Sequence, residues 1–372
     1  MSAVPPSAIP VRLPLHERYS DEAMNRFRQT GDPLADAVAQ DLKRGKPQHM
    51  LQEVIERAKT EGGIYQEFLD HGQSVPDWVD WDLIEQARRS QLIFSNQRAI
   101  TLLVSGLAEG TGLNKAADVL ANTGRFKPQK IAKRLYETGQ MLHNANSDGG
   151  LRPGGAGQHT IMEVRLLQAM VRKLLLAHGW DVDTLDVPIC QEDMLFTICE
   201  FDFLAVRGME RIGAHLPREQ RVAIHHFWQY VAWLNGVDVD LLSATPEEEE
   251  YLYQRIIERE HRVNATTVAR VHELIEGAAE STGMFLEKGV LFEMCRRCLG
   301  EERGAQYQLP NSLRDKAVMH GWIRLNRIFT ATMLKLPWLA DKMAAKNFQM
   351  MNKLLLENLE ADSNARAFRH IA

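Results

Sequence analysis

The sequence predicts an all-α protein, a single large helical domain built from about a dozen helices. Apolar residues recur every three or four positions through most of the 372 residues, which is the spacing of one helix face. We find no convincing run of alternating apolar and polar residues, so no strand is predicted. The length of the chain and its hydrophobic content of 45% are sufficient for a substantial core.

Composition and charge exclude several classes of protein. A net charge of −5 gives no basic footprint, so nucleic acid is not an expected partner. Four cysteines in a chain of this length do not form a disulfide framework. The first residues lack a cationic region followed by an apolar one, so no signal peptide is expected. No apolar run is long enough for a transmembrane helix, and the expected location is the cytoplasm.

The chain divides into four predicted parts. Residues 1–15 are rich in proline and are expected to form a flexible tail, followed by a helical extension over 16–75. The main domain is expected over 76–360, and 361–372 is a polar tail. Helices of the main domain are predicted at 83–107, 115–123, 128–142, up to 178, 191–212, 217–234, from 246, 264–281, 283–299, 313–334 and 337–359.

Several helix boundaries have a physical reason. Asp80 or Asp82 is expected to cap the first helix of the main domain. Thr245 is expected to cap the helix at Pro246, where four glutamates follow near the positive end of the helix dipole. The segment 144–157 has five glycines in its last nine residues, which predicts a tight turn.

The two helices on either side of this turn carry the polar residues that we select as candidates. They are spaced about one helical turn apart on each helix: Arg134, Glu137 and Thr138 on the first, and Arg165, Gln168 and Arg172 on the second. The second helix is otherwise mostly Leu, Met, Val and Ala, so its polar stripe needs partners or an anionic ligand. One interpretation is that these are satisfied core residues. The other is a site for haem, an acidic lipid or a prenyl-type ligand.

Other short motifs do not indicate a site. Cys295 and Cys298 form a single C-x-x-C pair within a helical pattern and are interpreted as structural thiols. His225 and His226 are adjacent, so they point to different faces of a helix and are not expected to bind one metal ion.

A series of motifs in one order resembles the rubber oxygenase, or latex-clearing, protein family and its MpaB-like fungal relatives in mycophenolic acid synthesis. The resemblance covers 76–236. It rests on Pro76-Asp-Trp-Val-Asp-Trp81, Asn122-Thr-Gly124, Arg134-Leu-x-x-Thr138, Pro153-Gly-Gly155, Val164-Arg-Leu-Leu-x-Ala-x-Val-Arg172, Val187-Pro-x-x-Gln191-Glu-Asp193, Gly208-x-x-Arg-Ile-Gly213 and the Trp228 helix that ends at Asn235-Gly-Val237.

The resemblance implies that 76–360 is an MpaB/rubber-oxygenase-like catalytic domain with a globin-like core. It implies haem b as the cofactor, with dioxygen and a small apolar substrate, isoprenoid or lipid-like, as partners. By position, Arg134 and Thr138 would line the distal side of the haem, with Asp118 as a base. Arg165 and Arg172 would hold the haem propionates or tie down the pocket.

Two positions depart from the family pattern. Gln168 stands where the family has its proximal histidine, and Glu137 stands where the rubber enzymes have a lysine. An amide is a poor ligand for haem iron, so His159 is the first alternative, with His143 and Tyr136 as further ones. Two hypotheses follow: a haem-dependent oxygenase, or a haem-free relative that binds a hydrophobic ligand or acts as an interaction protein.

Overall fold

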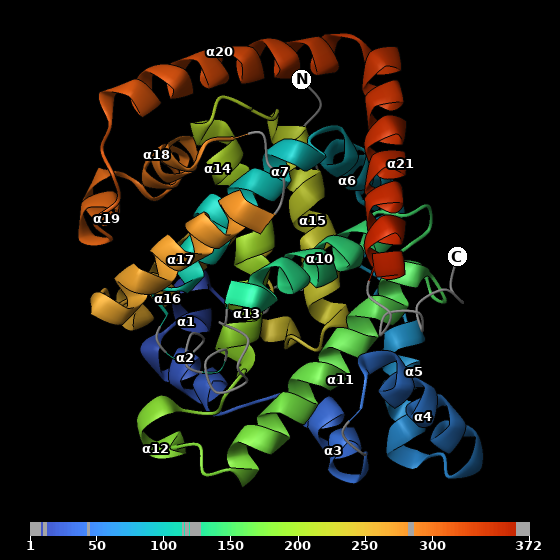
Figure 1. Cartoon of the computed structure of the whole chain (residues 1–372). Helices are drawn as coiled ribbons and strands as arrows, with labels where there is room; N and C mark the ends of the chain where they lie inside the picture. Colours follow the sequence, from blue (N-terminus) through green and yellow to red (C-terminus); the bar gives the residue numbers. More distant parts are fainter. Residues whose placement is uncertain are drawn as a thin grey trace.

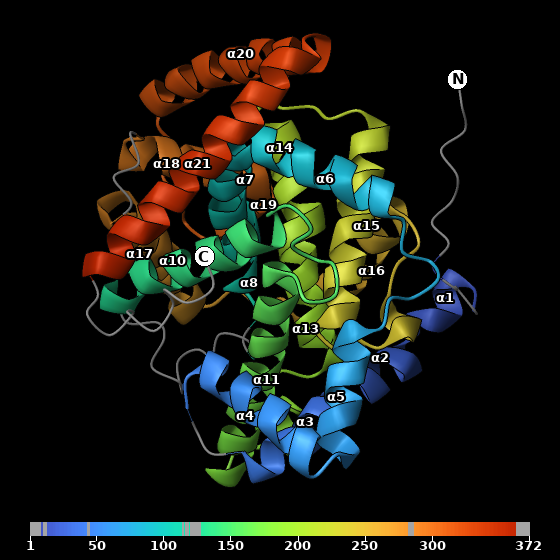
Figure 2. The same ribbon diagram turned by 90° about the vertical axis from the view of Figure 1, so that its right-hand side faces the viewer.

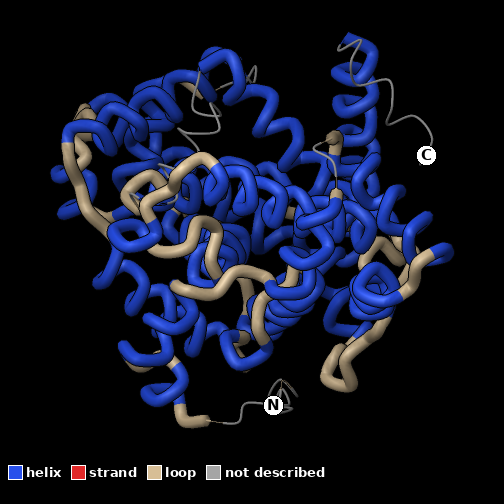
Figure 3. The backbone as a smooth tube through the Cα atoms, turned by 90° about the horizontal axis from the view of Figure 1, so that it is seen from below, coloured by secondary structure: helices blue, strands red, loops and turns tan. Residues whose placement is uncertain are grey.

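A computed structural model of the chain shows a fold built from helices (Figure 1). The structure describes residues 9, 13–42, 45–113, 115, 119, 128–281 and 286–361. Within these ranges there is no strand (Figure 3). A single isolated bridge among the described residues joins Leu113 to His261. The all-α prediction is confirmed. None of the described helices combines the length and the apolar character that a membrane span requires.

The helices have the following bounds. The first half contains α1 (Leu15–Arg18), α2 (Asp21–Arg28), α3 (Pro33–Asp41), α4 (Pro47–Thr60), α5 (Gly63–Gln73), α6 (Trp81–Ile93), α7 (Ser95–Thr101), the π-helix η1 (Leu102–Leu107), α8 (Ala108–Gly110), α10 (Pro128–Ala145) and α11 (Ala156–Ala177). The second half contains α12 (Val182–Leu185), α13 (Gln191–Cys199), the π-helix η2 (Glu200–Leu204), α14 (Ala205–Arg211), α15 (Arg218–Leu234), the 3-10 helix η3 (Val239–Leu241), α16 (Pro246–Glu260), α17 (Ala265–Ser281), α18 (Lys288–Leu299), α19 (Glu301–Gln306), α20 (Leu313–Lys335) and α21 (Pro337–Ala361).

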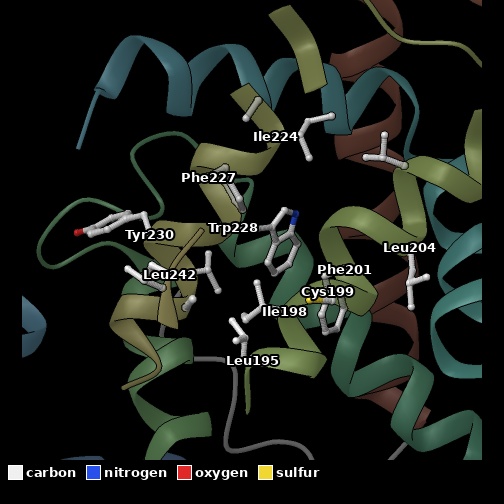
Figure 4. Packing of buried hydrophobic residues seen from close by; sticks show 14 of the residues in the cluster. Leu195, Ile198, Cys199, Phe201, Leu204, Ile224, Phe227, Trp228, Tyr230 and Leu242 are labelled. Atoms are coloured by element: carbon white, nitrogen blue, oxygen red, sulfur yellow. The ribbon is translucent and has the colours of Figure 1, made fainter. Parts of the chain in front are cut away.

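The largest core cluster surrounds α15, which packs along α6. Trp228 is fully buried here, and its ring stacks on Phe201 with 4.9 Å between the ring centroids (Figure 4). A second cluster lies between η1, α17, α18 and α20. A third joins α3, α4 and α5 to α11 through Met162, Leu166 and Met170 (Figure 2). The N-terminal helices therefore complete the surroundings of α11.

The predicted caps are present. Asp80, not Asp82, is the N-cap of α6, and its side chain accepts hydrogen bonds from the first turn. Thr245 caps α16 by accepting a hydrogen bond from the Glu248 amide, with Pro246 at the first helical position. These local signals were correct because each depends only on neighbouring residues.

Two long helices of the prediction are wrong in detail, because each contains a π-helix. The helix predicted over 83–107 divides into α6, α7 and η1, and the one predicted over 191–212 contains η2 between α13 and α14. Side chains of α7 bind carbonyls around η2: Arg98 Nη2 donates to Phe201 O over 2.8 Å, and the Thr101 hydroxyl donates to Ala205 O over 3.0 Å. A π-helix has one residue more per turn, which hydrophobic spacing does not reveal.

Three smaller differences concern short or late elements. Helices α12 and α19 were not predicted, because one or two turns give too few residues for a periodic signal. Helix α18 begins at Lys288 and not at the predicted position 283, which falls outside the described residues.

Gly157 fixes how closely α11 approaches the end of α10. A Cβ atom at this position would lie 2.5 Å from the Cα atom of Ala145, a backbone contact that no rotamer change relieves. We expect Gly157→Ala to lower the free energy of unfolding in urea by about 1–3 kcal/mol. Gly321→Ala on α20 is the control: a Cβ there meets no atom within 4 Å, so a gain of about 0.5–1 kcal/mol is expected. Equal effects of the two changes would contradict this account.

Candidate functional site

The candidate site lies around α11, which is joined to α10 by the predicted glycine-rich turn (Figure 1). Glycine is required within this turn because the backbone folds onto itself: a Cβ atom at Gly155 would lie 2.4 Å from Gly149 O. The turn sets α10 and α11 side by side in contact. The tight turn between the two helices is therefore present where the sequence predicted it.

Arg165 is buried on α11, and its guanidinium forms an ion pair with Asp32, the N-cap of α3. Arg165 Nη2 donates to Asp32 Oδ1 over 2.9 Å, and Nη1 lies 3.0 Å from Nδ1 of His71. The His71 ring also stacks on Trp233, with 4.3 Å between the ring centroids. The first arginine of the stripe is thus bound by residues of the N-terminal helices, one of which is in turn stacked on α15.

Arg172 is buried about two turns further along α11 and has its own acidic partner, Asp36 of α3. Its Nη2 donates to Ile189 O over 2.6 Å, and its Nε donates to Pro188 O over 3.1 Å. Both arginines therefore connect α11 to the rest of the fold. Propionate binding would require these donors to be released, and both predicted roles of the arginines stay predictions.

Gln168 lies between the two arginines in sequence but is in a different environment. Its Oε1 atom is buried and has no hydrogen-bond partner among the described residues. Along α11 it belongs to a stripe with Val164, Val171 and Leu175, all of them half-buried. We name these four residues the Gln168 stripe. It is an apolar surface with a single unpaired acceptor.

The expected distal residues are only partly described. Thr138 is half-buried and Glu137 is exposed, both on α10. Arg134 belongs to α10, but its side chain lies outside the described residues, as does the whole of Asp118. Whether these two side chains face the Gln168 stripe therefore stays a prediction.

The three alternative iron ligands, His159, His143 and Tyr136, lie in surroundings that differ from those of Gln168. His159 precedes Gln168 by nine residues, about two and a half helical turns, and so lies on the opposite side of α11. There it lines a cleft with Leu51 and Ile55 of α4. His143 stacks on Phe348, with 4.2 Å between the ring centroids. The position of His159 does not support its predicted role as a relocated ligand.

The Tyr136 hydroxyl, the third alternative ligand, donates to the carbonyl of Leu355 on α21 over 2.8 Å. The phenol is therefore engaged with α21.

Sequence reasoning missed a buried cluster formed by His225, Asp202 and Glu249. His225 Nδ1 lies 2.8 Å from Asp202 Oδ2 and 3.1 Å from Glu249 Oε2, and its Nε2 lies 3.0 Å from Ser243 O. Burial alone would lower the pKa of His225, but hydrogen bonds with Asp202 and Glu249 raise it to about 10. With acceptors at both ring nitrogens, the protonated imidazolium fits this cluster, and it leaves no lone pair for a metal ion.

His226 binds elsewhere, as the adjacent positions predicted: its Nε2 accepts a hydrogen bond from the Asp80 amide over 2.9 Å. The partners of His225 come from η2 and α16. They are separated from it by more than twenty residues along the chain, so no local motif could have identified the cluster.

His71 gives the arginine network a dependence on pH. Burial, with the charge of Arg165, lowers the pKa of His71 from 6.5 to about 4. The folded state thus favours the neutral ring, and its contribution to stability is present above pH 6.5 and lost as the pH falls towards 4. We expect His71→Gln to flatten the fall in unfolding free energy between pH 6.5 and 4, measured in urea. The exposed His320 on α20 is the control, and an unchanged slope in His71→Gln would contradict this assignment.

The comparisons with known proteins agree with the fold. Residues 87–328 match the family described as ER-bound oxygenase mpaB/B'/Rubber oxygenase, catalytic domain, whereas no curated protein matches the sequence. A solved structure described as "Structure of Latex Clearing Protein LCP in the closed state" is similar, with a TM-score of 0.62 and 17% sequence identity over 87% of this chain and 91% of that chain. At this identity the likeness shows the fold. Because the family match spans more than half of its residues, the chain belongs to the mpaB/rubber oxygenase catalytic-domain family.

Proposed function

We propose that this family member binds an apolar, isoprenoid- or lipid-like ligand along the Gln168 stripe, without a haem held through the family's proximal imidazole. The observation that carries the proposal is Gln168 itself. Its buried Oε1 is unpaired within the described part of the chain, and its neighbours on the stripe are aliphatic and half-buried. Ligand pockets commonly combine such an apolar surface with one or two polar groups.

The side chains around α11 do not fit a haem ligated as in the family. Haem iron takes imidazole, thiolate, thioether or phenolate ligands, and an amide is none of these. The guanidinium groups of Arg165 and Arg172 are already neutralised by Asp32 and Asp36. A propionate at either arginine would have to displace the carboxylate that now neutralises it, which for Arg165 would leave the buried Asp32 unpaired.

The unpaired acceptor indicates the chemistry of the ligand. A buried carbonyl oxygen without a hydrogen bond is unfavourable, and a donor that reaches it regains that free energy. The hydroxyl group of an otherwise apolar alcohol is such a donor. The chain of the alcohol would cover Val164, Val171 and Leu175, which are half-buried.

Haem-dependent oxygenase chemistry on an apolar substrate is the second candidate, and membership of the family favours it. It requires an iron ligand other than Gln168. Arg134, Thr138 and Asp118 would then act on the distal side, as the resemblance implies. The two candidates predict different absorption spectra for the purified protein.

The first test is the spectrum of protein produced with a haem precursor. We expect no Soret band in the unmodified protein and a Soret band in Gln168→His, because the imidazole would restore the family's ligand. Gln140→His on α10 and His159→Ala are the controls, and neither is expected to bind haem. A Soret band of full occupancy in the unmodified protein would overturn the haem-free proposal and favour the oxygenase.

The second test measures the ligand directly. We expect farnesol to bind more tightly than its hydrocarbon analogue farnesene by about 2- to 12-fold, the range that one net hydrogen bond provides. Gln168→Leu is expected to remove this difference while binding of farnesene persists, as titration calorimetry would show. The proposal would be wrong if the alcohol kept its advantage in Gln168→Leu.

A further inference from the structure

A separate cleft lies on the other side of α10, between α6, α7, α21 and the two π-helices, with a volume of about 80 Å³. It is lined by Gly139, Leu142 and His143 of α10 and by Asn146 directly after the helix, at positions i, i+3, i+4 and i+7. Residues of the Gln168 stripe do not line it. The inference drawn from it is therefore independent of the proposed function.

Arg98 of α7 lies in the wall of this cleft, with only 7% of its surface exposed. Its Nη2 donates to Phe201 O over 2.8 Å, but its buried Nη1 has no hydrogen-bond partner among the described residues. Burial lowers the pKa of Arg98 to about 10, with the charge of Asp202 acting in the opposite direction. The guanidinium is thus cationic at neutral pH, and one of its amino groups is unsatisfied.

Among the described residues, no acid forms an ion pair with this guanidinium. Asp202 contributes only through its charge, since its carboxylate is engaged with the His225 ring at 2.8 Å. A buried guanidinium without a carboxylate at contact distance is unfavourable unless an anion reaches it. Arg98 therefore differs from Arg165 and Arg172, whose acidic partners come from the chain itself.

The amide side chains of the cleft already have partners. Gln91 accepts a hydrogen bond from Trp228 Nε1 over 3.1 Å and donates to Asn146 Oδ1 over 3.2 Å. Asn347 donates to Leu92 O over 2.8 Å. Within the described residues, Nδ1 of His143 is a second buried atom of the cleft without a partner. Of the buried polar atoms that line the cleft within the described residues, those without a hydrogen bond are thus Nη1 of Arg98 and Nδ1 of His143.

Apart from Ser95, the remaining lining is apolar. It consists of Leu92, Ala99, Leu102, Gly139, Leu142, Phe201, Ala205 and Met351. A phosphate carries more charge and more acceptors than one unsatisfied guanidinium nitrogen can match, whereas a carboxylate needs one such cation. The apolar wall adds a preference for a hydrocarbon chain.

We propose that this cleft binds an apolar monocarboxylic acid of medium chain length. The carboxylate accepts a hydrogen bond from Arg98 Nη1, and the chain lies against Leu102, Leu142 and Met351. The guanidinium supplies the charge, and its second amino group stays on Phe201 O. The ligand completes the hydrogen bonding of a group that is buried in the fold.

Titration calorimetry with octanoate and with octan-1-ol tests the proposal on the full chain. Octanoate is expected to bind, and octan-1-ol to bind at least about tenfold more weakly, because a hydrogen bond to a charged group is stronger than a neutral one. Arg98→Gln is expected to remove this preference for the acid. Equal binding of acid and alcohol to the unmodified protein, or no binding of octanoate, would overturn the proposal.

Two matched variants keep the result interpretable. Arg89→Gln removes an arginine that is paired with Asp341 at the surface, and it is expected to leave octanoate binding unchanged. Arg98→Lys keeps a cation at the site and is expected to restore at least part of the preference that Arg98→Gln loses. If Arg98→Gln fails to fold, Arg98→Lys alone decides. Equal binding of octanoate and octan-1-ol to Arg98→Lys, which keeps a cation, would then contradict the role of charge.

Discussion

The ion pair between Asp32 and Arg165 is the interaction on which the surroundings of α11 depend. The turn after α15 closes over it, because a Cβ atom at Gly236 would lie 2.1 Å from Asp32 Oδ2 and 2.6 Å from Arg165 Nε. Gln191 at the start of α13 then donates to both Gly31 O and Gly236 O, over 2.8 and 2.9 Å. The segments α3, α11, α13 and the turn after α15 thus meet at one buried ion pair. Loss of one partner of such a pair costs about 3–5 kcal/mol.

This junction explains why the fold does not depend on the residue at position 168. Arg165 and Arg172 are held by the acids of α3, and the aliphatic side of α11 packs on α4 and α5. Neither contact involves Gln168. The contacts that stabilise α11 are thus made by its other side chains, including the two arginines next to Gln168 on the same helical stripe, and not by the residue that departs from the family pattern.

Much of the fold followed from local rules, while the sites depended on distant contacts. Helical spacing and the caps at Asp80 and Thr245 needed only neighbouring residues, and the polar stripe of α11 was recognisable as requiring partners. Those partners, Asp32 and Asp36, lie more than 130 residues away, and spacing along one helix cannot identify them. The same limit applies to Arg98, whose helix was predicted without the π-helices that shape its surroundings.

The paired π-helices also affect which changes of length the chain can accept. A π-helix contains one residue more than the α-helical turn that it replaces. Loss of one residue within η2 would therefore restore a regular α-helix, while the helices before and after it would keep nearly the same rotation. The change would be local, at the carbonyls of Phe201 and Ala205 that receive the side chains of α7. A change of length by one residue is thus easier to accommodate within this segment than within the regular helices on either side of it, where it would rotate one end by about 100°.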